Sequence, residues 1–480
     1  MINRILLYYP YGALFQRGED RSQGDITSSC ATNLRAANDL GYMCAVLRKM
    51  GIGVAIRDYM GERKTKKDFL NDLKVFRPDM IVCSMTTATI LSDLDTFRLA
   101  KSVNPNIVTV AKGAYFYCAE FNAVNYEVFQ PMDYALAGES ETIIDKLVLA
   151  LNTGQSVSSL KGIIRRSEKT YVSNGPANFV DNLDTIPFPA RNSMNNDIYT
   201  SQDTGEPMAT IQTDRGCPFE CTYCLSPIIS GRAIRYRSTE NILEEIRECI
   251  DKFNIRNFFF KSDTFTASRQ HVQELCNRII EEKLNIRWVA NSRIKPIDYE
   301  TLSLMKRAGC WLVGFGIESG NEETLRRIKK GITIEDVINA VQLTKKAGLQ
   351  IYGFFMFGFP WETGKHVSDT ISFAKRLALD YYEFHLCIFY PGTPLYNEAF
   401  NEGLIAKGDN PEGKSYFTNP SGTLNLSKEE LLKYRKNAII SIYFSPSYII
   451  RRLAKIRNFK NLINMLSYGI MRLIWNMLKY

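Results

Sequence analysis

Short apolar runs alternate with helical patterns along most of this 480-residue chain, and this alternation limits the possible folds more than any other feature. In the first 150 residues the runs Met80–Thr86 and Ile107–Val110 are almost continuously apolar, as in parallel strands buried on both faces. Apolar residues at helical spacing lie between them over Leu91–Val103. The pattern predicts an α/β fold with a doubly wound, Rossmann-like sheet, whose ligands bind beyond the carboxyl ends of the strands.

A second series of strand and helix patterns runs from about residue 210 to residue 400. The predicted strands are Thr210–Thr213, Phe258–Phe260, Arg287–Ala290, Leu312–Ile317, Ile351–Phe357 and Tyr382–Phe389. About six β–α units predict a partial (β/α)6 barrel, in which chemistry takes place at the carboxyl ends of the strands. We therefore predict a first domain over 1–150, a connector with a weak hairpin over 151–205, a barrel over 206–405, and a helical C-terminal extension over 406–480.

Three cysteines share one glycine- and proline-bent loop at the start of the predicted barrel. Cys217, Cys221 and Cys224 have the spacing C-x3-C-x2-C, and the next cysteine and the nearest histidine are Cys249 and His271. The loop thus supplies three thiolates to a metal centre that takes four ligands, and it leaves one position open for a substrate. A structural zinc site would be closed by four ligands, and a bacterial ferredoxin loop has another order and a fourth cysteine. The remaining alternative is three cysteines that only pack.

The cysteine spacing, with the aromatic Tyr223 just before the last cysteine, resembles the cluster loop of the radical S-adenosylmethionine (radical SAM) enzymes. The resemblance implies a 4Fe–4S cluster bound by Cys217, Cys221 and Cys224. Its fourth iron would bind the amino and carboxylate groups of S-adenosylmethionine. An electron from the cluster would then break the sulfonium and give a 5′-deoxyadenosyl radical.

The same resemblance implies further contacts with S-adenosylmethionine at the ends of the barrel strands. Besides Tyr223, these are Asp263, Arg293, Glu318, Ser319 and Gly358. Asp263 would meet the methionine ammonium, and Arg293 its carboxylate, which suits a guanidinium. Glu318 and Ser319 would contact the ribose or methionine, and Gly358 would let the backbone approach the adenine. Many relatives have two adjacent aspartates where this chain has Ser262 and Asp263. Solvated loop groups or helix caps are the alternative at each position.

The first domain resembles the cobalamin-binding domain that often precedes a radical SAM core. The resemblance lies in Leu40–Gly51, Pro78–Thr87 and Gly138–Glu141. It implies cobalamin contacts at Thr86, Thr87, Gly113, Gly138 and Glu139, all of which could instead be ordinary turn residues. The chain has no histidine before His271, so it lacks the Asp-x-His-x-x-Gly motif that ligates cobalt. The resemblance then implies cobalamin bound without a protein imidazole, or a domain that keeps the fold without the cofactor.

Composition limits the cellular setting. Hydrophobic residues make up 45% of the chain and charged residues 23%, as in soluble globular proteins, and eleven cysteines without paired spacing favour a reducing cytoplasm. There is neither a signal peptide nor an apolar run of about 18 residues. Of the net charge of +9, seven cations lie in residues 437–480 without any acid, so the body of the protein is not expected to bind nucleic acid.

The basic C-terminal segment has helical spacing of apolar residues from Ser447 to Tyr480. Such a helix can make peripheral contact with an anionic membrane surface, or it can dock on the barrel with its cations in water. On strand Tyr382–Phe389, Glu383 and His385 share one face and are either substrate contacts or a structural pair.

These observations predict an enzyme that cleaves S-adenosylmethionine with a 4Fe–4S cluster, for cobalamin-dependent methylation of an unactivated carbon. One alternative is radical oxidation or cyclisation of an apolar substrate without methyl transfer. Another, from a different class, is a non-catalytic iron–sulfur or cobalamin-binding protein. The expected partners are a small-molecule or lipid substrate and a one-electron reductant such as flavodoxin or ferredoxin.

Overall fold

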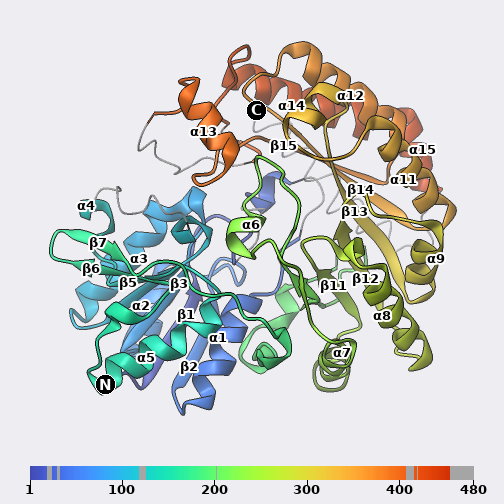
Figure 1. Ribbon diagram of the computed structural model, residues 1–480. Helices are drawn as coiled ribbons and strands as arrows, with labels where there is room; N and C mark the ends of the chain where they lie inside the picture. The colour runs from blue at the N-terminus through green and yellow to red at the C-terminus, as the bar shows by residue number, and fades with distance from the viewer. Residues whose placement is uncertain are drawn as a thin grey trace.

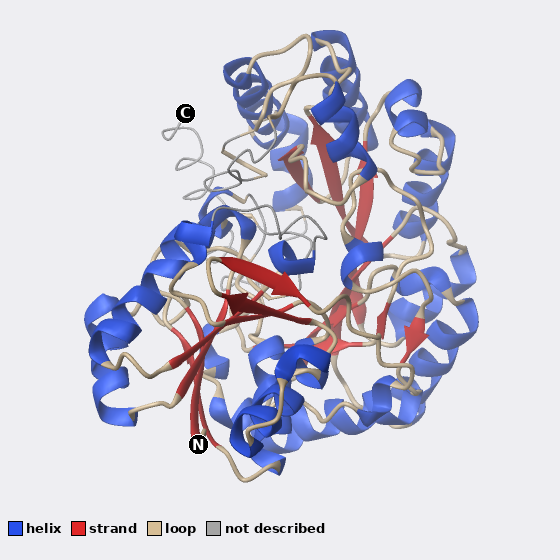
Figure 2. Cartoon of the chain, turned by 60° about the vertical axis from the view of Figure 1, so that its left-hand side comes forward, coloured by secondary structure: helices blue, strands red, loops and turns tan. Residues whose placement is uncertain are grey.

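The computed structural model describes residues 1–18, 24–29, 33–117, 126–201, 203–406, 416–418 and 420–454. The chain is α/β, as predicted, and contains two large sheets with helices packed against them (Figures 1 and 2). Most strands in both sheets run parallel, since the chain returns through a helix after nearly every strand.

The first sheet has seven strands in the order β2-β1-β3-β4-β5-β6-β7. Its strands are β1 (Arg4–Tyr9), β2 (Gly53–Asp58), β3 (Met80–Ser84), β4 (Val108–Lys112), β5 (Tyr134–Leu136), β6 (Ile163–Ser167) and β7 (Thr170–Ser173). Its helices are α1 (Asn38–Lys49), α2 (Lys66–Phe76), α3 (Ile90–Val103), α4 (Tyr126–Phe129) and α5 (Ile144–Thr153). Alternate residues of β1 enter two cores: Ile5 and Leu7 pack with α1 and α5, whereas Leu6 and Tyr8 pack with α2 and α3. Both faces of the sheet are therefore buried, as the apolar runs predicted.

Two local features differ from the prediction. The weak hairpin that we placed in the connector is β6 and β7, and it continues the first sheet because β6 pairs antiparallel with β5. The apolar spacing over Leu34–Met50 predicts a helix from Leu34, but α1 begins at Asn38, whose side-chain amide donates to the Thr210 carbonyl, 2.7 Å away in the second sheet. The domain bounds given above stay a prediction.

The second sheet has six parallel strands in the order β15-β14-β13-β12-β11-β8. They are β8 (Met208–Gln212), β11 (Asn257–Lys261), β12 (Arg287–Ser292), β13 (Cys310–Glu318), β14 (Gln350–Phe357) and β15 (Tyr381–Leu386). The helices between and after them are α7 (Thr239–Phe253), α8 (Arg269–Glu281), α9 (Tyr299–Arg307), α10 (Glu322–Arg327), α11 (Ile334–Lys346), α12 (Gly364–Leu377), α13 (Pro394–Asn401), α14 (Lys428–Tyr443) and α15 (Pro446–Leu453). In the described part of the chain β8 and β15 do not pair, so the sheet is open between them.

The segment between β1 and α1 reaches this open side of the second sheet. Ser29 donates a hydrogen bond to Glu383 on β15, and Arg435 of α14 donates to the Ser28 carbonyl at 2.7 Å. At the other end of the segment Asn38 bonds to β8. The described parts of this segment, residues 24–29 and 33–38, thus connect both edges of the second sheet to the first domain.

The described part of the C-terminal segment docks on β15, which is one of the two interpretations of the sequence. The Tyr448 hydroxyl donates to the Asp380 carbonyl at 2.9 Å, and Arg452 donates to the Tyr381 hydroxyl at 2.9 Å. Residues 455–480, which carry the rest of the predicted basic helix, lie outside the described residues. None of the helices that the structure describes has the length and apolar character to cross a bilayer.

Candidate active site

A cavity of about 210 Å³ lies between the carboxyl ends of the second-sheet strands, the cysteine loop and the first domain. All three cysteines of the loop line it. The strand ends contribute Asp263, Arg293 and Glu318, and the first domain contributes residues between Gln16 and Arg35. This is the place at which parallel β/α architectures bind their ligands.

The cysteine loop follows β9 (Asp214–Arg215), which pairs with β10 (Arg235–Tyr236). At the start of the loop, Gly216 has φ of +109°, and a Cβ there would fall 2.0 Å from the Ala233 carbonyl oxygen. Only glycine fits at this position, where the cysteine loop passes the backbone that leads to β10. Beyond it, the Cys217 amide donates to the Gly231 carbonyl at 3.0 Å, so the first cysteine is held against the chain that returns to β10.

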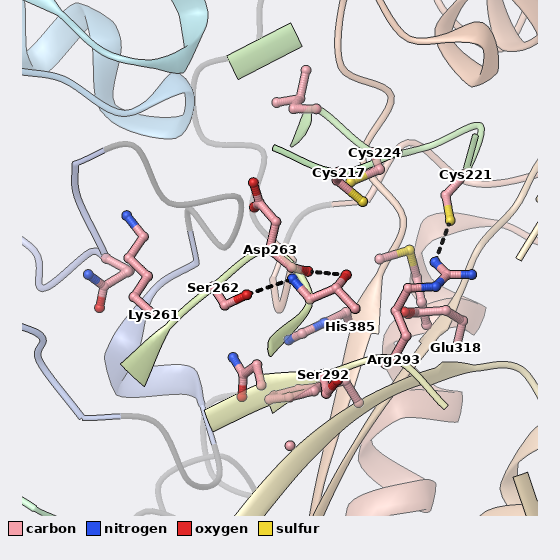
Figure 3. Close-up of a pocket in the computed structure, with 18 of the residues that line it drawn as sticks. Cys217, Cys221, Cys224, Lys261, Ser262, Asp263, Ser292, Arg293, Glu318 and His385 are labelled. Carbon is pink, nitrogen blue, oxygen red and sulfur yellow. Dashed lines mark hydrogen bonds between the residues drawn. The ribbon is translucent and has the colours of Figure 1, made fainter. Parts of the chain in front are cut away.

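The three cysteines fit a 4Fe–4S cluster better than a single ion. Cys217 and Cys221 are buried, and Figure 3 shows the three sulfurs at one side of the cavity. Among the described residues, no three cysteine, histidine or acidic side chains approach one another as the ligands of one ion do. Thiolates that each bind a different iron of a cube-shaped cluster stand farther apart than that, and among the described residues no fourth cysteine lines the cavity.

Arg293 lies beside the second cysteine. Its Nη1 is 3.2 Å from the Cys221 sulfur (Figure 3), and its guanidinium stacks 3.7 Å over the centre of the Phe219 ring. The Arg293 Nε is buried without a hydrogen-bond partner among the described residues, so a donor remains for an anionic ligand.

Glu318 and Lys330 form a buried ion pair in the cavity wall. The Lys330 Nζ lies 2.7 Å from Glu318 Oε1 and 3.3 Å from the Tyr223 hydroxyl. Burial alone would raise the pKa of Glu318, but Lys330 outweighs it, and the pKa is lowered. Glu318 also has φ of +67°, a left-handed backbone conformation that is costly for a residue other than glycine. The sequence did not single out Lys330, which follows Glu318 by twelve residues with no spacing signal.

Asp263 binds the cysteine loop. Its Oδ2 accepts the Gly216 amide at 2.9 Å and its Oδ1 accepts the Ser226 hydroxyl at 3.3 Å. Ser262, which stands where many relatives have an aspartate, donates to Asp214 Oδ1 at 2.8 Å. Burial raises the pKa of Asp214 to about 7. A carboxyl group is thus present beside Ser262, but β9 supplies it, and sequence reasoning missed it.

Two of the predicted contacts with S-adenosylmethionine do not line the cavity. The Ser319 hydroxyl lies 3.0 Å from that of Thr370 on α12, and it accepts the Asn321 amide at 3.1 Å. Gly358 has φ of +97°, and its amide donates to Glu362 Oε2 at 2.7 Å. Both positions stabilise the turns that follow strands β13 and β14.

The predicted cobalamin contacts lie at the carboxyl edge of the first sheet, and none of them lines this cavity. Thr86 and Thr87 are buried, and the Thr86 hydroxyl lies 2.8 Å from that of Thr89. Gly113 has φ of +143°, and a Cβ there would fall 2.2 Å from the Met85 carbonyl oxygen. Gly138 is packed against Ala177 in a similar way, with its Cβ position 2.7 Å from that side chain.

Glu139, the fifth predicted cobalamin contact, faces the cysteine loop instead. Its Oε1 lies 2.9 Å from Arg215 Nη1 and 2.9 Å from Arg235 Nη2, and Glu141 lies 2.6 Å from the same Arg215 nitrogen. The first histidine of the chain is His271, so the first domain has no imidazole to offer a cobalt ion.

Glu383 and His385 share one face of β15, as predicted, but only His385 lines the cavity. Glu383 is fully buried and accepts hydrogen bonds from Ser29 and, at 2.9 Å, from the Tyr352 hydroxyl. Burial lowers the pKa of His385 to about 4, so its imidazole is neutral. The two residues have different roles: a structural carboxylate and a neutral group in the cavity wall.

Comparison with known proteins places the chain in a family. Residues 211–374 match the model of the Radical SAM superfamily. An uncharacterized methyltransferase of Pyrococcus horikoshii is 31% identical over 414 residues, which are 86% of this chain and 88% of that protein. Cytidylyl-2-hydroxyethylphosphonate methyltransferase of Streptomyces wedmorensis is 25% identical over 88% of this chain and 86% of that protein.

Among solved structures, the radical SAM methyltransferase TsrM from Kitasatospora setae, with cobalamin and a 4Fe–4S cluster bound, matches with a TM-score of 0.67. The sequence identity is 20%, over 84% of this chain and 78% of that chain, so this likeness concerns the fold. It extends over both sheets. With the cysteine loop and the family match, the chain belongs to the radical SAM enzymes and, within them, to those that carry a cobalamin-binding-type domain before the barrel.

Proposed function

We propose that this protein is a cobalamin-dependent radical SAM methyltransferase that acts on an unactivated carbon of a small-molecule substrate. The observation that carries the proposal is one cavity whose described lining has three cysteines and no fourth, Arg293 with a buried unpartnered donor, and residues of the first domain. When bound, the cluster with S-adenosylmethionine would supply a radical that removes hydrogen from carbon, and cobalamin would supply the methyl carrier.

The residues of the cavity have distinct proposed roles. Cys217, Cys221 and Cys224 would ligate the cluster, and Arg293 would pair with the methionine carboxylate through its remaining donor. Asp263 holds the cysteine loop and would also accept from the methionine ammonium. Glu318 and Tyr223, both held by Lys330, would contact the ribose or methionine. Ser319 and Gly358 remain proposed contacts with S-adenosylmethionine, made by the turns in which they lie.

The protein also has to keep water from a reactive radical. The first-domain segment between β1 and α1 closes the open side of the second sheet through Ser29 and Asn38. Since these contacts join two domains, closure is a property of the whole chain and not of the barrel alone. The electron would come from a cellular reductant such as flavodoxin or ferredoxin.

Cobalamin binding is proposed at the carboxyl edge of the first sheet, through Thr86, Thr87, Gly113, Gly138 and the backbone at Glu139. What supports it is the fold shared with cobalamin-bound TsrM and the sequence similarity to two methyltransferases. The side chain of Glu139 is already engaged by Arg215 and Arg235, so we expect no contact from that carboxylate.

The test is anaerobic purification with cobalamin supplied, followed by quantitation of iron, sulfide and corrinoid and by an assay of S-adenosylmethionine cleavage. A full cluster and one corrinoid per chain, with cleavage under reducing conditions, would support the proposal. A full cluster with cleavage but no corrinoid would favour oxidation or cyclisation without methyl transfer. An intact cluster without any cleavage would exclude the enzymatic function and leave an iron–sulfur protein.

A further inference from the structure

One part of the cavity wall crosses four neighbouring strands of the second sheet. It consists of Asn291 on β12, Gly314 on β13, Phe354 on β14 and His385 on β15, all of which line the cavity. Asn291 is in register with Gln-free backbone at Gly314, and His385 is in register with Met356, which shares a strand face with Phe354. We call Asn291, Gly314, Phe354 and His385 the ring shelf.

Gly314 leaves room for the Phe354 ring. A Cβ at Gly314 would fall 2.9 Å from Cε2 of Phe354, and closer still to Oδ1 of Asn291. The ring therefore reaches over β13 toward the Asn291 amide, and a larger residue at position 314 would displace both side chains. Phe354 is half-buried and lines the cavity, so part of its ring is open to a ligand.

His385 continues the aromatic surface on the other side of Phe354 (Figure 3). The two rings are nearly parallel, with an interplanar angle of 15° and 6.0 Å between their centroids. The rings of Tyr416 and Phe417 each lie 5.3 Å from that of His385. Phe417 is itself held by Arg435, whose guanidinium lies 4.8 Å over the centre of its ring. The shelf is therefore ordered before a ligand binds, which lowers the entropic cost of binding.

The two ends of the ring shelf are polar and neutral. Burial lowers the pKa of His385 to about 4, so one ring nitrogen carries a hydrogen-bond donor and the other an acceptor. The Asn291 carboxamide likewise has a donor and an acceptor. Neither side chain has a hydrogen bond with any residue that the structure describes, so both can bond to a ligand that lies on Phe354.

The ring shelf lies deeper in the second sheet than the proposed contacts with S-adenosylmethionine. Asn291 comes two residues before Arg293, and Gly314 comes four residues before Glu318. At about 3.3 Å per residue these offsets correspond to about 7 and 13 Å along the strands. A ligand on the shelf would therefore lie further into the cavity than the groups that we assign to the cofactor.

We infer that the substrate presents a flat ring with hydrogen-bonding groups at its edge, which stacks on Phe354 and bonds to Asn291 and His385. This inference rests on the proposed function, because it concerns the substrate of that reaction. Heteroaromatic rings and unsaturated ring lactams have this chemistry. A flat ring gains most from stacking on an aromatic side chain, and a plain hydrocarbon ring would leave the polar ends of the shelf unpaired.

Three small neutral probes of similar size test the inference on the reconstituted full-length enzyme. 2-Pyridone is flat and has an N–H donor and a carbonyl acceptor, δ-valerolactam has the same two groups on a puckered ring, and N-methyl-2-pyridone is flat but lacks the donor. Dissociation constants are measured by ligand-observed nuclear magnetic resonance, without a reductant. 2-Pyridone should bind about fivefold more tightly than either of the other two probes.

Variants then locate the two preferences separately. Phe354→Leu should remove most of the preference over δ-valerolactam, because the flat surface is lost. Asn291→Leu and His385→Phe should each reduce the preference over N-methyl-2-pyridone, and His385→Phe should keep the preference for a flat ring. His271→Phe is the control, since it removes an imidazole of α8 that is outside the described lining of the cavity. Iron content is measured on each protein, and if Phe354→Leu does not assemble the cluster, the other two variants decide the test.

Added S-adenosylmethionine shows which ligand the ring shelf serves. Without a reductant the cofactor stays intact, and both preferences should persist when it is saturating. If it abolishes the binding of 2-pyridone, the shelf holds the adenine of the cofactor, and the inference is overturned. Equal binding of the three probes to wild type, or preferences that survive all three variants, would also overturn it. Failure to cleave S-adenosylmethionine under reducing conditions is a separate result and speaks against the proposed function itself.

Discussion

The carboxylate of Glu141 lies 2.6 Å from the guanidinium of Arg215, two residues before the first cysteine of the cluster loop. Glu139 joins the same guanidinium at 2.9 Å and also pairs with Arg235, the strand partner of Arg215. These side chains are almost completely buried. The turn after β5 of the first domain therefore holds both strands at the base of the cluster loop.

Replacing Glu141 by glutamine should affect both the stability and the cluster. Loss of one carboxylate leaves the buried Arg215 paired with Glu139 alone, which should cost about 1.5–3 kcal/mol of unfolding free energy. The added net positive charge near the cluster should also shift its reduction potential upwards, because the reduced cluster carries more negative charge. Urea unfolding of the apo-protein and potentiometric titration of the reconstituted protein measure the two effects.

Glu240→Gln is the matched control for this prediction. Glu240 pairs with Arg247 at 2.8 Å and with Arg278 at 2.7 Å on the protein surface, where solvent screens its charge, so its loss should change the stability little. It should leave the potential unchanged. Equal effects of the two substitutions would mean that the Glu141–Arg215 pair does not act on the cluster loop.

Cys221→Ala should abolish cleavage of S-adenosylmethionine and remove most of the iron, with the first domain still folded. The cavity would keep only two thiolates, and Arg293 would lose its contact with the sulfur. Cys249→Ala is the control, because Cys249 is fully buried in α7, outside the cavity, and burial raises its pKa to about 12. That variant should keep its iron. An active Cys221→Ala enzyme would refute the assignment of the cluster ligands.

Gly216→Ala should prevent assembly of the cluster loop. Its Cβ would lie 2.0 Å from the Ala233 carbonyl oxygen, at a backbone φ of +109° that alanine rarely adopts. Gly154→Ala is the control, since Gly154 also has positive φ, +69°, but no atom within 4 Å of a Cβ, so only about 1 kcal/mol of backbone strain is expected. The iron content of the two variants measures the difference. Iron retained in Gly216→Ala would show that the backbone around Gly216 and Ala233 can move apart without loss of the cluster loop.

The sequence was sufficient for features that depend on local periodicity. Strands β3 and β11 lie within two residues of the predicted runs, because strands buried on both faces are continuously apolar. The start of α1 at Asn38 was not predictable, because the Asn38 side chain bonds to Thr210 in a sheet that follows much later in the chain. The hairpin β6–β7 was expected, but its attachment to β5 depends on tertiary pairing.

In the candidate site, too, residues grouped along the sequence were predicted, and residues brought together by tertiary contacts were missed. The three cysteines were evident from their spacing, since one loop carries them all. Lys330 was missed because it meets Glu318 only through the way the chain turns back after α10. Asp214 was missed because it meets Ser262 only through the pairing of β8 with β11. Glu139 was assigned to cobalamin from its position after a strand, whereas its carboxylate pairs with arginines near the cluster loop. A buried carboxylate after a strand does not reveal from which domain its partner comes.

The last prediction concerns the turn after β14. Burial raises the pKa of Glu362 from 4.5 to about 7, although the Gly358 and Phe359 amides donate to its carboxylate at 2.7 and 3.2 Å. Between these pH values the folded protein keeps a proton that the unfolded chain has released. The free energy of unfolding should therefore fall as the pH rises from 4.5 to about 7, by at most about 3 kcal/mol, and level off above that.

Glu362→Gln should remove this pH dependence. The amide does not titrate, and its oxygen can still accept a hydrogen bond from the Gly358 amide. Between pH 5 and pH 8 the free energy of unfolding of the variant should therefore rise relative to that of wild type by up to about 3 kcal/mol. Urea unfolding of the apo-protein across that range measures the difference. Glu335→Gln, at an exposed position of α11, is the control, and its unfolding free energy should depend on pH as that of wild type does. A Glu362→Gln profile that is also parallel would mean that the carboxyl group is already ionised in the folded protein at pH 5, held so by the two amides of the turn.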